Sequence, residues 1–301
     1  MKTGWKPLLL AAALWLALHG VASPWRTLAL PLVLPPITAL SALLSPAAFA
    51  PLLALAFAAA YYSPGGNGPF AFAVGLLLLG PAILMGRLYR RGSDAVTVVR
   101  TGFLAVLAVL LLAVALLTGV FRVDLAAELR TVMEPPLSRT AAANAGLLPE
   151  NWAEETALML ADSIVTLLPT LLLMTAFLLT VMNQYLSRRI LNWAGIPVPG
   201  LPPLKTWRLP GYFVFLYLLA LLASLLSTGD GFWGGAVANL VPMLRLAFTI
   251  QALGFLFFLA DVKRWPRVVP VLVSAPFMLL PPFYLVGLMD VAFPLRKYFA
   301  K

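Results

Sequence analysis

The feature that most constrains this chain of 301 residues is a series of long apolar runs that carry almost no charge. Only 11% of its residues are charged, against about 25% in a soluble domain, so polar side chains could not cover a soluble core of this length. The chain therefore predicts an all-α, polytopic transmembrane helix bundle of about eight or nine membrane segments, at about 20 apolar residues for each crossing. Residues 1–301 are expected to form a single integral membrane domain.

Short loops separate the apolar runs, and two of the runs have more than one interpretation. Single crossings are expected at residues 7–22, 47–62, 70–85, 98–121, 157–185, 212–226 and 236–260. The run 28–44 contains three prolines, so it is either a kinked span or a re-entrant segment with protein neighbours. The run 268–290 either crosses the membrane or bends at Pro281-Pro282 into a hairpin, which would return the C-terminus to the side it came from.

The charged residues are distributed asymmetrically between the loops. If each run crosses once, the N-terminus and the basic loops 87–100, 187–209 and 261–267 fall on one side, which their arginines and lysines mark as cytoplasmic. The loop 187–209 is also rich in proline. Residues 122–155 hold six of the eleven acidic residues, so we expect an acidic amphipathic loop with a short helix on the non-cytoplasmic side. The net charge of +10 thus reflects membrane topology, and no nucleic acid partner is expected.

Arg245 is the charged residue that lies deepest in an apolar run, near the middle of residues 234–260. An arginine at the centre of a span costs about 2.5–3.5 kcal/mol on insertion scales, so its side chain needs an anion, a carbonyl group or water. Asn239 and Gln251 each lie six residues from Arg245, and the three side chains point about 120° apart around the helix. A helix that is polar on every third of its surface is expected in the centre of the bundle.

Acidic residues on other runs offer Arg245 two partners. Asp162 lies near the outer edge of the 157–185 span, with Thr166 on the same helical face, and Asp290 ends the last run. In one interpretation Arg245 makes a structural ion pair with one of these carboxylates and binds nothing. In another, polar groups line a solvated cavity that opens toward the acidic loop and binds a small anionic ligand; its candidate residues are Arg245, Asn239, Gln251, Asp162, Thr166 and Asp290. A misplaced helix boundary is the third interpretation.

The sequence contains no pattern typical of catalysis or of metal binding. It has no cysteine and a single histidine, His19, so we expect no metal site and no cofactor. Walker A, His-Glu-x-x-His and Gly-x-Ser-x-Gly patterns are absent as well, and we expect that the protein is not an enzyme. In the first helix, Ala13 and Ala17 form a small-xxx-small pair, which either lets another transmembrane helix dock closely or arises by chance in an alanine-rich run.

Several short motifs give the chain a resemblance to a known family. They lie at 183–189, Trp207–Pro210, Asn239, Gln251–Gly254, Gly287–Asp290 and Arg296-Lys297, and more loosely at 64–66, Gly86 and Arg90–Ser93. With these motifs the chain resembles the YybS-like family of uncharacterised bacterial membrane proteins. The resemblance implies a multi-pass protein of the bacterial cytoplasmic (inner) membrane, with a fold similar to the substrate-binding components of energy-coupling-factor transporters. Those components bind a small molecule near the outer membrane face, and a small-residue motif in their first helix, which Ala13 and Ala17 would match, docks a transmembrane coupling subunit.

Two functions from different classes remain. The first is a transporter-like component that binds a small molecule within the lipid bilayer and depends on a separate ATPase and coupling subunit, because the sequence shows no ATP site. The alternative is a non-transporting membrane scaffold or regulator that recruits a partner through its cytoplasmic loops. A water-filled cavity at Arg245 would favour the first function. A partner that is lost on changes within 187–209, but not on changes at Arg245, would favour the second.

Overall fold

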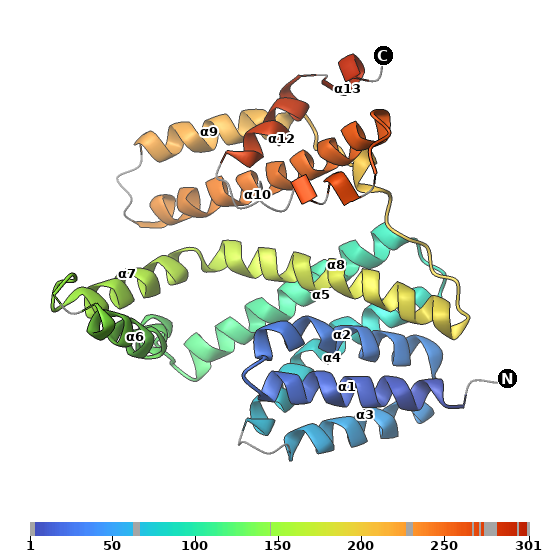
Figure 1. Cartoon of the computed structure of the whole chain (residues 1–301). Coiled ribbons are helices and arrows are strands. Elements are labelled where there is room, and N and C mark those ends of the chain that lie inside the picture. The colour runs from blue at the N-terminus through green and yellow to red at the C-terminus, as the bar shows by residue number, and fades with distance from the viewer. Residues whose placement is uncertain are drawn as a thin grey trace. The chain divides into compact units, whose positions relative to one another are not determined.

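The computed structural model describes residues 4–62, 67–144, 146–226, 231–266, 268–270, 272–273, 282–293 and 295–299 (Figure 1). The regular elements of these residues are all helices, which confirms the predicted all-α class. Their contacts divide the chain into two compact units: unit 1 comprises Met1–Asp124 and Leu172–Leu201, and unit 2 comprises Leu125–Leu171 and Pro202–Lys301. The single integral domain stays a prediction.

Five helices in the described part of the chain are long and apolar enough to cross a membrane. They are α2 (Arg26–Leu43), α4 (Gly68–Arg90), α5 (Ala95–Ala115) with its π-helical extension η1 (Leu116–Val120), α8 (Leu168–Ala194) and α10 (Gly231–Val262). Shorter apolar helices are α1 (Lys6–Ala22), α3 (Pro46–Tyr61), α9 (Tyr212–Leu226) and α12 (Phe283–Ala292). The predicted runs thus correspond to apolar helices, whereas the number of eight or nine membrane segments stays a prediction.

In unit 1, α2 is the central helix and packs against both α1 and α4. Its middle turns are fully buried, at Val33, Leu34, Ile37, Ala39 and Leu40. The run 28–44 is one continuous helix despite its three prolines, and Pro35 and Pro36 are buried. Protein neighbours therefore surround the backbone that these prolines leave unpaired, as a helix in a membrane requires.

The C-terminal ends of α2 and α8 are completed in different ways, α2 by an arginine side chain and α8 by a glycine. Arg90 of α4 donates hydrogen bonds to the carbonyl oxygens of Ser41, Ala42 and Leu44, where α2 ends and its last carbonyls lack helical partners. The helix α8 continues through residues 187–194, which were expected in the basic loop, and the residue after its end, Gly195, has φ +94°. Only glycine adopts this left-handed conformation without strain, so the loop begins one residue after the helix ends.

The span expected at 157–185 is two helices, α7 (Trp152–Thr166) of unit 2 and α8, whose first residues belong to unit 2 and the rest to unit 1; they are separated at Leu167. Pro169 follows the break and has no N–H to donate to an earlier turn. The acidic segment 122–155 is more helical than expected, because α6 (Leu125–Ala143) and the first turn of α7 occupy most of it. These two helices pack together, and Arg130 of α6 contacts Glu154 of α7 at 2.6 Å.

The short helix α12 runs parallel to the C-terminal half of α10. Tyr284 lies beside Arg245, Gly287 approaches Phe248, and Asp290 contacts Gln251, so residue numbers rise together along both helices. Ten residues of helix extend about 15 Å, which is half of a bilayer core of about 30 Å. This arrangement favours the hairpin interpretation of 268–290, whose bend at Pro281 lies outside the described residues.

Candidate functional site

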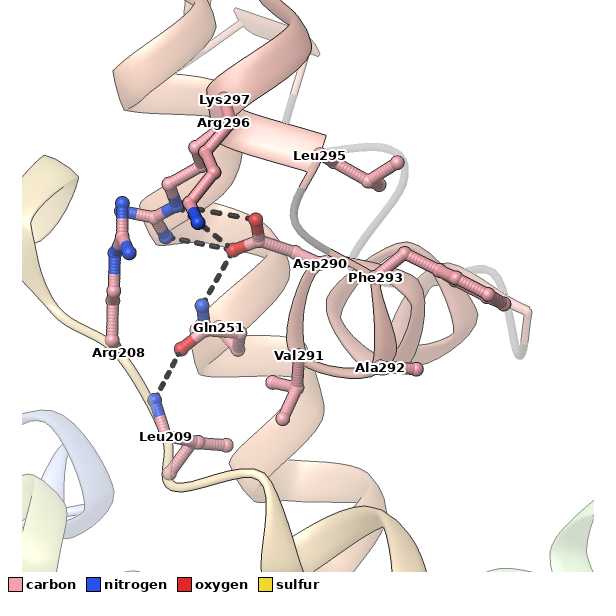
Figure 2. Close-up of a pocket in the computed structure, with 10 residues that line it drawn as sticks. All are labelled: Arg208, Leu209, Gln251, Asp290, Val291, Ala292, Phe293, Leu295, Arg296 and Lys297. Atoms are coloured by element: carbon pink, nitrogen blue, oxygen red, sulfur yellow. Dashed lines mark hydrogen bonds and ion pairs between the residues drawn. The ribbon is translucent and has the colours of Figure 1, made fainter.

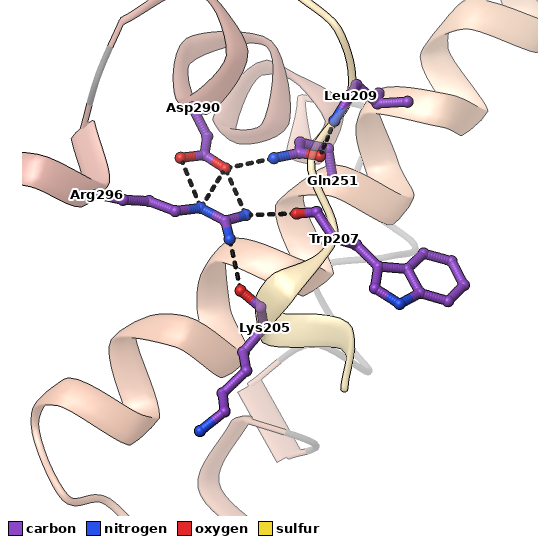
Figure 3. A network of polar contacts seen from close by, with 6 residues as sticks. All are labelled: Lys205, Trp207, Leu209, Gln251, Asp290 and Arg296. Atoms are coloured by element: carbon purple, nitrogen blue, oxygen red, sulfur yellow. Dashed lines mark hydrogen bonds and ion pairs between the residues drawn. The ribbon is translucent and has the colours of Figure 1, made fainter. Parts of the chain in front are cut away.

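A buried ion pair joins α12 to the short helix α13 (Leu295–Phe299). The side chains of Asp290 and Arg296 are 1% and 5% exposed, and Arg296 Nη2 lies 2.8 Å from Asp290 Oδ2. Arg296 Nε also donates to both carboxylate oxygens, at 3.2 Å to Oδ1 and 3.0 Å to Oδ2 (Figure 3). Asp290 was the second candidate partner of Arg245, and the structure pairs it with Arg296.

Backbone and amide groups complete the network around this pair. Arg296 donates to the carbonyl oxygens of Lys205 and Trp207, at 2.6 and 3.1 Å. Gln251 donates to Asp290 Oδ2 at 2.5 Å and accepts the N–H of Leu209 at 2.9 Å (Figure 3). A buried pair repays its desolvation only when its other donors and acceptors are bonded. The hydrogen bonds of this network therefore hold the segment 205–209 against α10 and α12.

Two glycines allow the backbones to approach closely enough for this network. A Cβ atom on Gly287 of α12 would lie 1.8 Å from the carbonyl oxygen of Phe248 and 2.8 Å from the nitrogen of Ala252, both on α10. A Cβ on Gly254 would lie 2.8 Å from the carbonyl oxygen of Leu204. Any larger residue at either position would push apart the elements that hold the ion pair.

A basic pocket of about 310 Å³ lies against the network (Figure 2). Its lining residues are Arg208, Leu209, Gln251, Asp290, Val291, Ala292, Phe293, Leu295, Arg296 and Lys297. Three of these side chains are cationic and only Asp290 is anionic, and Arg296 already pairs with Asp290. Arg208 and Lys297 are exposed and have no ion-pair partner within the described part of the chain, so the pocket suits an anion.

The pocket lies at the basic-loop end of unit 2. Lys205, beside the network, pairs with Asp261 at the C-terminal end of α10. The acidic helix α7 meets α10 near the opposite end, where Asn239 contacts Thr166. The cavity was expected to open toward the acidic loop; the basic pocket lies beside Gln251, in the half of α10 that leads to loop 261–267.

Arg245 lies apart from this pocket, on an exposed part of α10. Its Nε donates to the hydroxyl of Tyr217 at 3.2 Å, and its guanidinium lies 5.2 Å from the centre of the Tyr284 ring. Among the described residues it forms no ion pair. The ion pair with Asp162 or Asp290 that one interpretation predicted is therefore not formed. Asp290 pairs with Arg296, and Asp162 has no ion pair within the described part of the chain.

Asn239 bridges the break between α7 and α8. In a continuous helix the N–H of Thr170 would donate to the carbonyl of Thr166. Here the Thr170 N–H donates to Asn239 Oδ1 at 3.0 Å, and Asn239 Nδ2 donates to the Thr166 carbonyl at 2.7 Å. The Thr170 hydroxyl adds a hydrogen bond to Asn239 Oδ1 at 2.8 Å. One side-chain amide thus replaces the hydrogen bond that the break removes.

The remaining predicted residues lie elsewhere. Asp162 is exposed and lines a cavity of about 480 Å³ between α6 and α7, together with Arg130 and Glu134. Of the six predicted ligand-binding residues, Gln251 and Asp290 line the basic pocket together. In unit 1, Ala13 and Ala17 line an apolar groove of about 380 Å³ formed by α1, α2 and α8.

The sequence reasoning missed two groups of residues. Arg208, Arg296 and Lys297 were noted as basic residues and within motifs of the family resemblance, but not as site residues, because no pattern links them before the chain folds. In unit 1, a buried polar cluster consists of Thr38, Asn183, Gln184 and Ser187. The last three lie on one helix at spacings of one to four residues in an apolar run, and that spacing is the signal that could have identified them.

Comparison with known proteins gives a family and one relative. Residues 11–291 match the family described as "Predicted membrane protein (DUF2232)". Over 136 residues the chain is 25% identical to the "Uncharacterized protein YybS" of Bacillus subtilis (strain 168), which is 44% of this chain and 44% of that protein. The match thus spans less than half the length of that curated relative. No solved structure matches the chain.

Proposed function

We propose that this chain, which belongs to the DUF2232 family of predicted membrane proteins, is a transporter-like component that binds a small anionic molecule. The observation that carries the proposal is the basic pocket, where Arg208 and Lys297 remain without a counter-charge beside the Asp290–Arg296 pair. The expected likeness to the substrate-binding components of energy-coupling-factor transporters is part of this proposal.

The pocket offers groups for binding rather than for bond cleavage. Arg208 presents a planar guanidinium that can hold a carboxylate or phosphate group with two parallel hydrogen bonds, and Lys297 adds a point charge. Val291, Phe293 and Leu295 add apolar atoms to the lining of the pocket. The one carboxylate of the pocket, Asp290, is engaged by Arg296 and Gln251, so we propose ligand binding without catalysis.

The distribution of basic residues supports a bacterial inner-membrane protein with a cytoplasmic N-terminus. In unit 1, Lys6 at the start of α1 donates to the carbonyl of Trp193 at the end of α8, so the N-terminus adjoins the basic loop that begins at Gly195. In unit 2, the tail residues Arg296 and Lys297 adjoin Lys205. Lysine and arginine favour the cytoplasmic side, so the pocket would open toward the cytoplasm.

Transport would need further subunits. The proposal includes a separate ATPase, and a transmembrane coupling subunit that docks in the apolar groove of Ala13 and Ala17. Small residues let helices approach closely, which is the contact such a subunit would make. The scaffold or regulator remains the alternative; retention of a partner through loop 187–209 by a chain that binds no anion would favour it.

The proposal is tested by anion titration of the chain in nanodiscs of zwitterionic lipid. The probes are sodium phosphate and sodium acetate, with sodium chloride at equal ionic strength as the reference, and the readout is the midpoint of thermal unfolding. Each charge-assisted hydrogen bond contributes roughly 1.5–3 kcal/mol. We therefore expect Arg208→Gln with Lys297→Gln to weaken the anion response about tenfold or more.

The control variant is Arg139→Gln, which removes an exposed arginine of α6 outside the pocket and should leave the response unchanged. An equal response in the double variant and the parent chain would disprove the proposal. Stabilisation by phosphatidylglycerol in the nanodisc, without any response to free anions, would assign the pocket to a lipid headgroup and would also disprove it.

A further inference from the structure

Arg245 lies too far from either end of α10 for its side chain to reach a lipid headgroup. It lies 14 residues after the first residue of α10 and 17 before the last, which corresponds to about 21 and 25 Å along the helix. A single side chain does not cover that distance, so snorkelling to the phosphate layer cannot neutralise this charge. An exposed guanidinium at this depth needs water or an anion that comes to it.

Two tyrosines fix the orientation of the guanidinium. Its Nε donates to the hydroxyl of Tyr217, which is 2% exposed and packs edge-on against the Phe248 ring at 5.6 Å. One face of the guanidinium lies over the ring of Tyr284. The Nε edge and one face are thus occupied, and the Tyr284 hydroxyl is a second side-chain hydrogen-bond partner of the guanidinium. Among the described residues no carboxylate pairs with it, so its charge is not neutralised there.

The Nη groups form the part of arginine that matches an oxyanion. Their parallel N–H bonds fit the two oxygens of a carboxylate or of a phosphate group. We propose that Arg245, held by Tyr217 and Tyr284, is a second anion-binding site at membrane depth, reached through water and separate from the basic pocket. Its ligand class is a small carboxylate or phosphate.

The short helix α12 connects the two sites. Tyr284 at its beginning contacts Arg245, and Asp290 near its end contacts Gln251 of the basic pocket. Arg245 and Gln251 are six residues apart on α10, so the sites are separated by about 9 Å along the helix. The same small anion can therefore be bound at either end of this half-length helix.

The test uses the absence of native cysteine from the sequence. In the background Thr249→Cys, the new thiol lies one helical turn from Arg245, and Thr249 is partly exposed. The full chain in nanodiscs is treated with membrane-impermeant methanethiosulfonate reagents, one anionic and one cationic. We expect both to react, with a ratio of anionic to cationic rates that falls at least tenfold when Arg245→Gln is added.

Competition shows binding as distinct from charge attraction. Sodium phosphate or sodium acetate should slow the reaction of Thr249→Cys relative to sodium chloride, and Arg245→Lys, which keeps the charge but not the paired donors, should lose most of this protection. Leu219→Cys on the exposed face of α9 is the lipid-facing control and should stay unreactive. Arg208→Gln with Lys297→Gln should leave the protection intact, so the two sites can fail separately.

Three results would overturn the inference. A thiol at 249 that reacts with neither reagent would mean that water does not reach Arg245. A rate ratio that is indifferent to Arg245→Gln would mean that the guanidinium does not set the local charge. Protection that disappears with the pocket variants and persists in Arg245→Gln would assign all binding to the basic pocket.

Discussion

The two units are stabilised by different kinds of contact. Unit 1 has an extensive apolar core around α2, and the polar side chains within it are neutral: Asn183 donates to the hydroxyl of Thr38 at 3.1 Å and accepts from Ser187 at 2.8 Å. Unit 2 has a small buried core of Tyr217, Ala220, Leu244 and Phe248, and a buried ion pair beside it. Unit 1 is therefore stabilised mainly by close apolar packing, whereas the stability of unit 2 depends on a few polar contacts at the candidate site.

This difference is the basis for the role that we propose for each unit. A core of neutral, interlocked side chains responds little to charge, so unit 1 suits a scaffold or a docking surface. A unit in which one arginine joins two helices and a loop responds strongly to any change of charge nearby, which suits ligand binding. The following predictions measure how far this contrast holds.

The largest effect is expected from Gly287→Ala. The added Cβ would meet backbone atoms of α10 rather than a side chain that can turn away, so α12 must move and the ion pair must open. We expect a loss of about 3 kcal/mol or more in the free energy of unfolding, measured in micelles. Gly80→Ala in α4 of unit 1 is the matched control, because its Cβ would meet no atom within 4 Å. Equal melting of both variants would contradict the prediction.

The next effect is expected at the ion pair itself. Asp290→Asn leaves the Arg296 guanidinium buried without its counter-charge, and breaking a buried pair in this way costs about 3–5 kcal/mol. Replacing both partners together, with Asp290→Leu and Arg296→Met, should recover much of the loss. The control is Asp261→Asn in the exposed pair with Lys205, which should change stability by less than about 1 kcal/mol. If the two single variants cost the same, unit 2 does not depend on its buried charge.

A smaller effect is expected at the break between α7 and α8. Asn239→Leu leaves the Thr170 N–H and the Thr166 carbonyl without their partner, at about 1–3 kcal/mol for a buried unpaired group. Thermal unfolding of the variant measures this loss. Asn144→Leu removes an exposed amide at the end of α6 and should have little effect. If Asn239→Leu lost no more stability than the control, water would be forming the hydrogen bonds at the break in place of the amide.

Features that depend on neighbouring residues in the sequence could be predicted, whereas contacts between residues far apart in the sequence could not. The run 212–226 was predicted with the bounds that α9 has, because hydropathy is a local property of the chain. The break at Leu167 was missed, because Pro169 allows either a kink or a break, and the residue that bridges it, Asn239, lies 69 positions after Thr170 in the sequence. Arg245 was identified correctly as a charge within an apolar run. Its contacts with Tyr217 and Tyr284 were not predicted, because aromatic residues are common in apolar runs and nothing in the sequence singles these two out.

The same limit explains the candidate site. Gln251 and Asp290 were selected as polar residues in apolar segments, and both line the basic pocket. Arg208 and Arg296 come from a loop and a tail, and nothing in the sequence indicates that they line one pocket. Arg208 and Arg296 come together only because Gly254 and Gly287 let the backbones approach closely. That role is visible in the distances between backbone atoms, and the neighbouring residues in the sequence do not indicate it.

The smallest effect is expected at Asp94, a charged residue of unit 1 that lies outside the spans. It caps α5 by accepting the N–H of Thr97 at 3.0 Å, and hydrogen bonds from Thr97 lower the pKa of its carboxyl below the ordinary value of 3.8. Because the folded pKa is the lower one, the contribution to stability is complete above 3.8 and is lost as the pH falls through the folded value. Unfolding midpoints from about pH 6 to about pH 3 should therefore fall less in Asp94→Asn, which keeps an acceptor without a titrating group. Since this carboxyl is fully exposed, the difference should be much smaller than that for Asp290→Asn. A difference of similar size would show that charge matters to unit 1 as much as to unit 2.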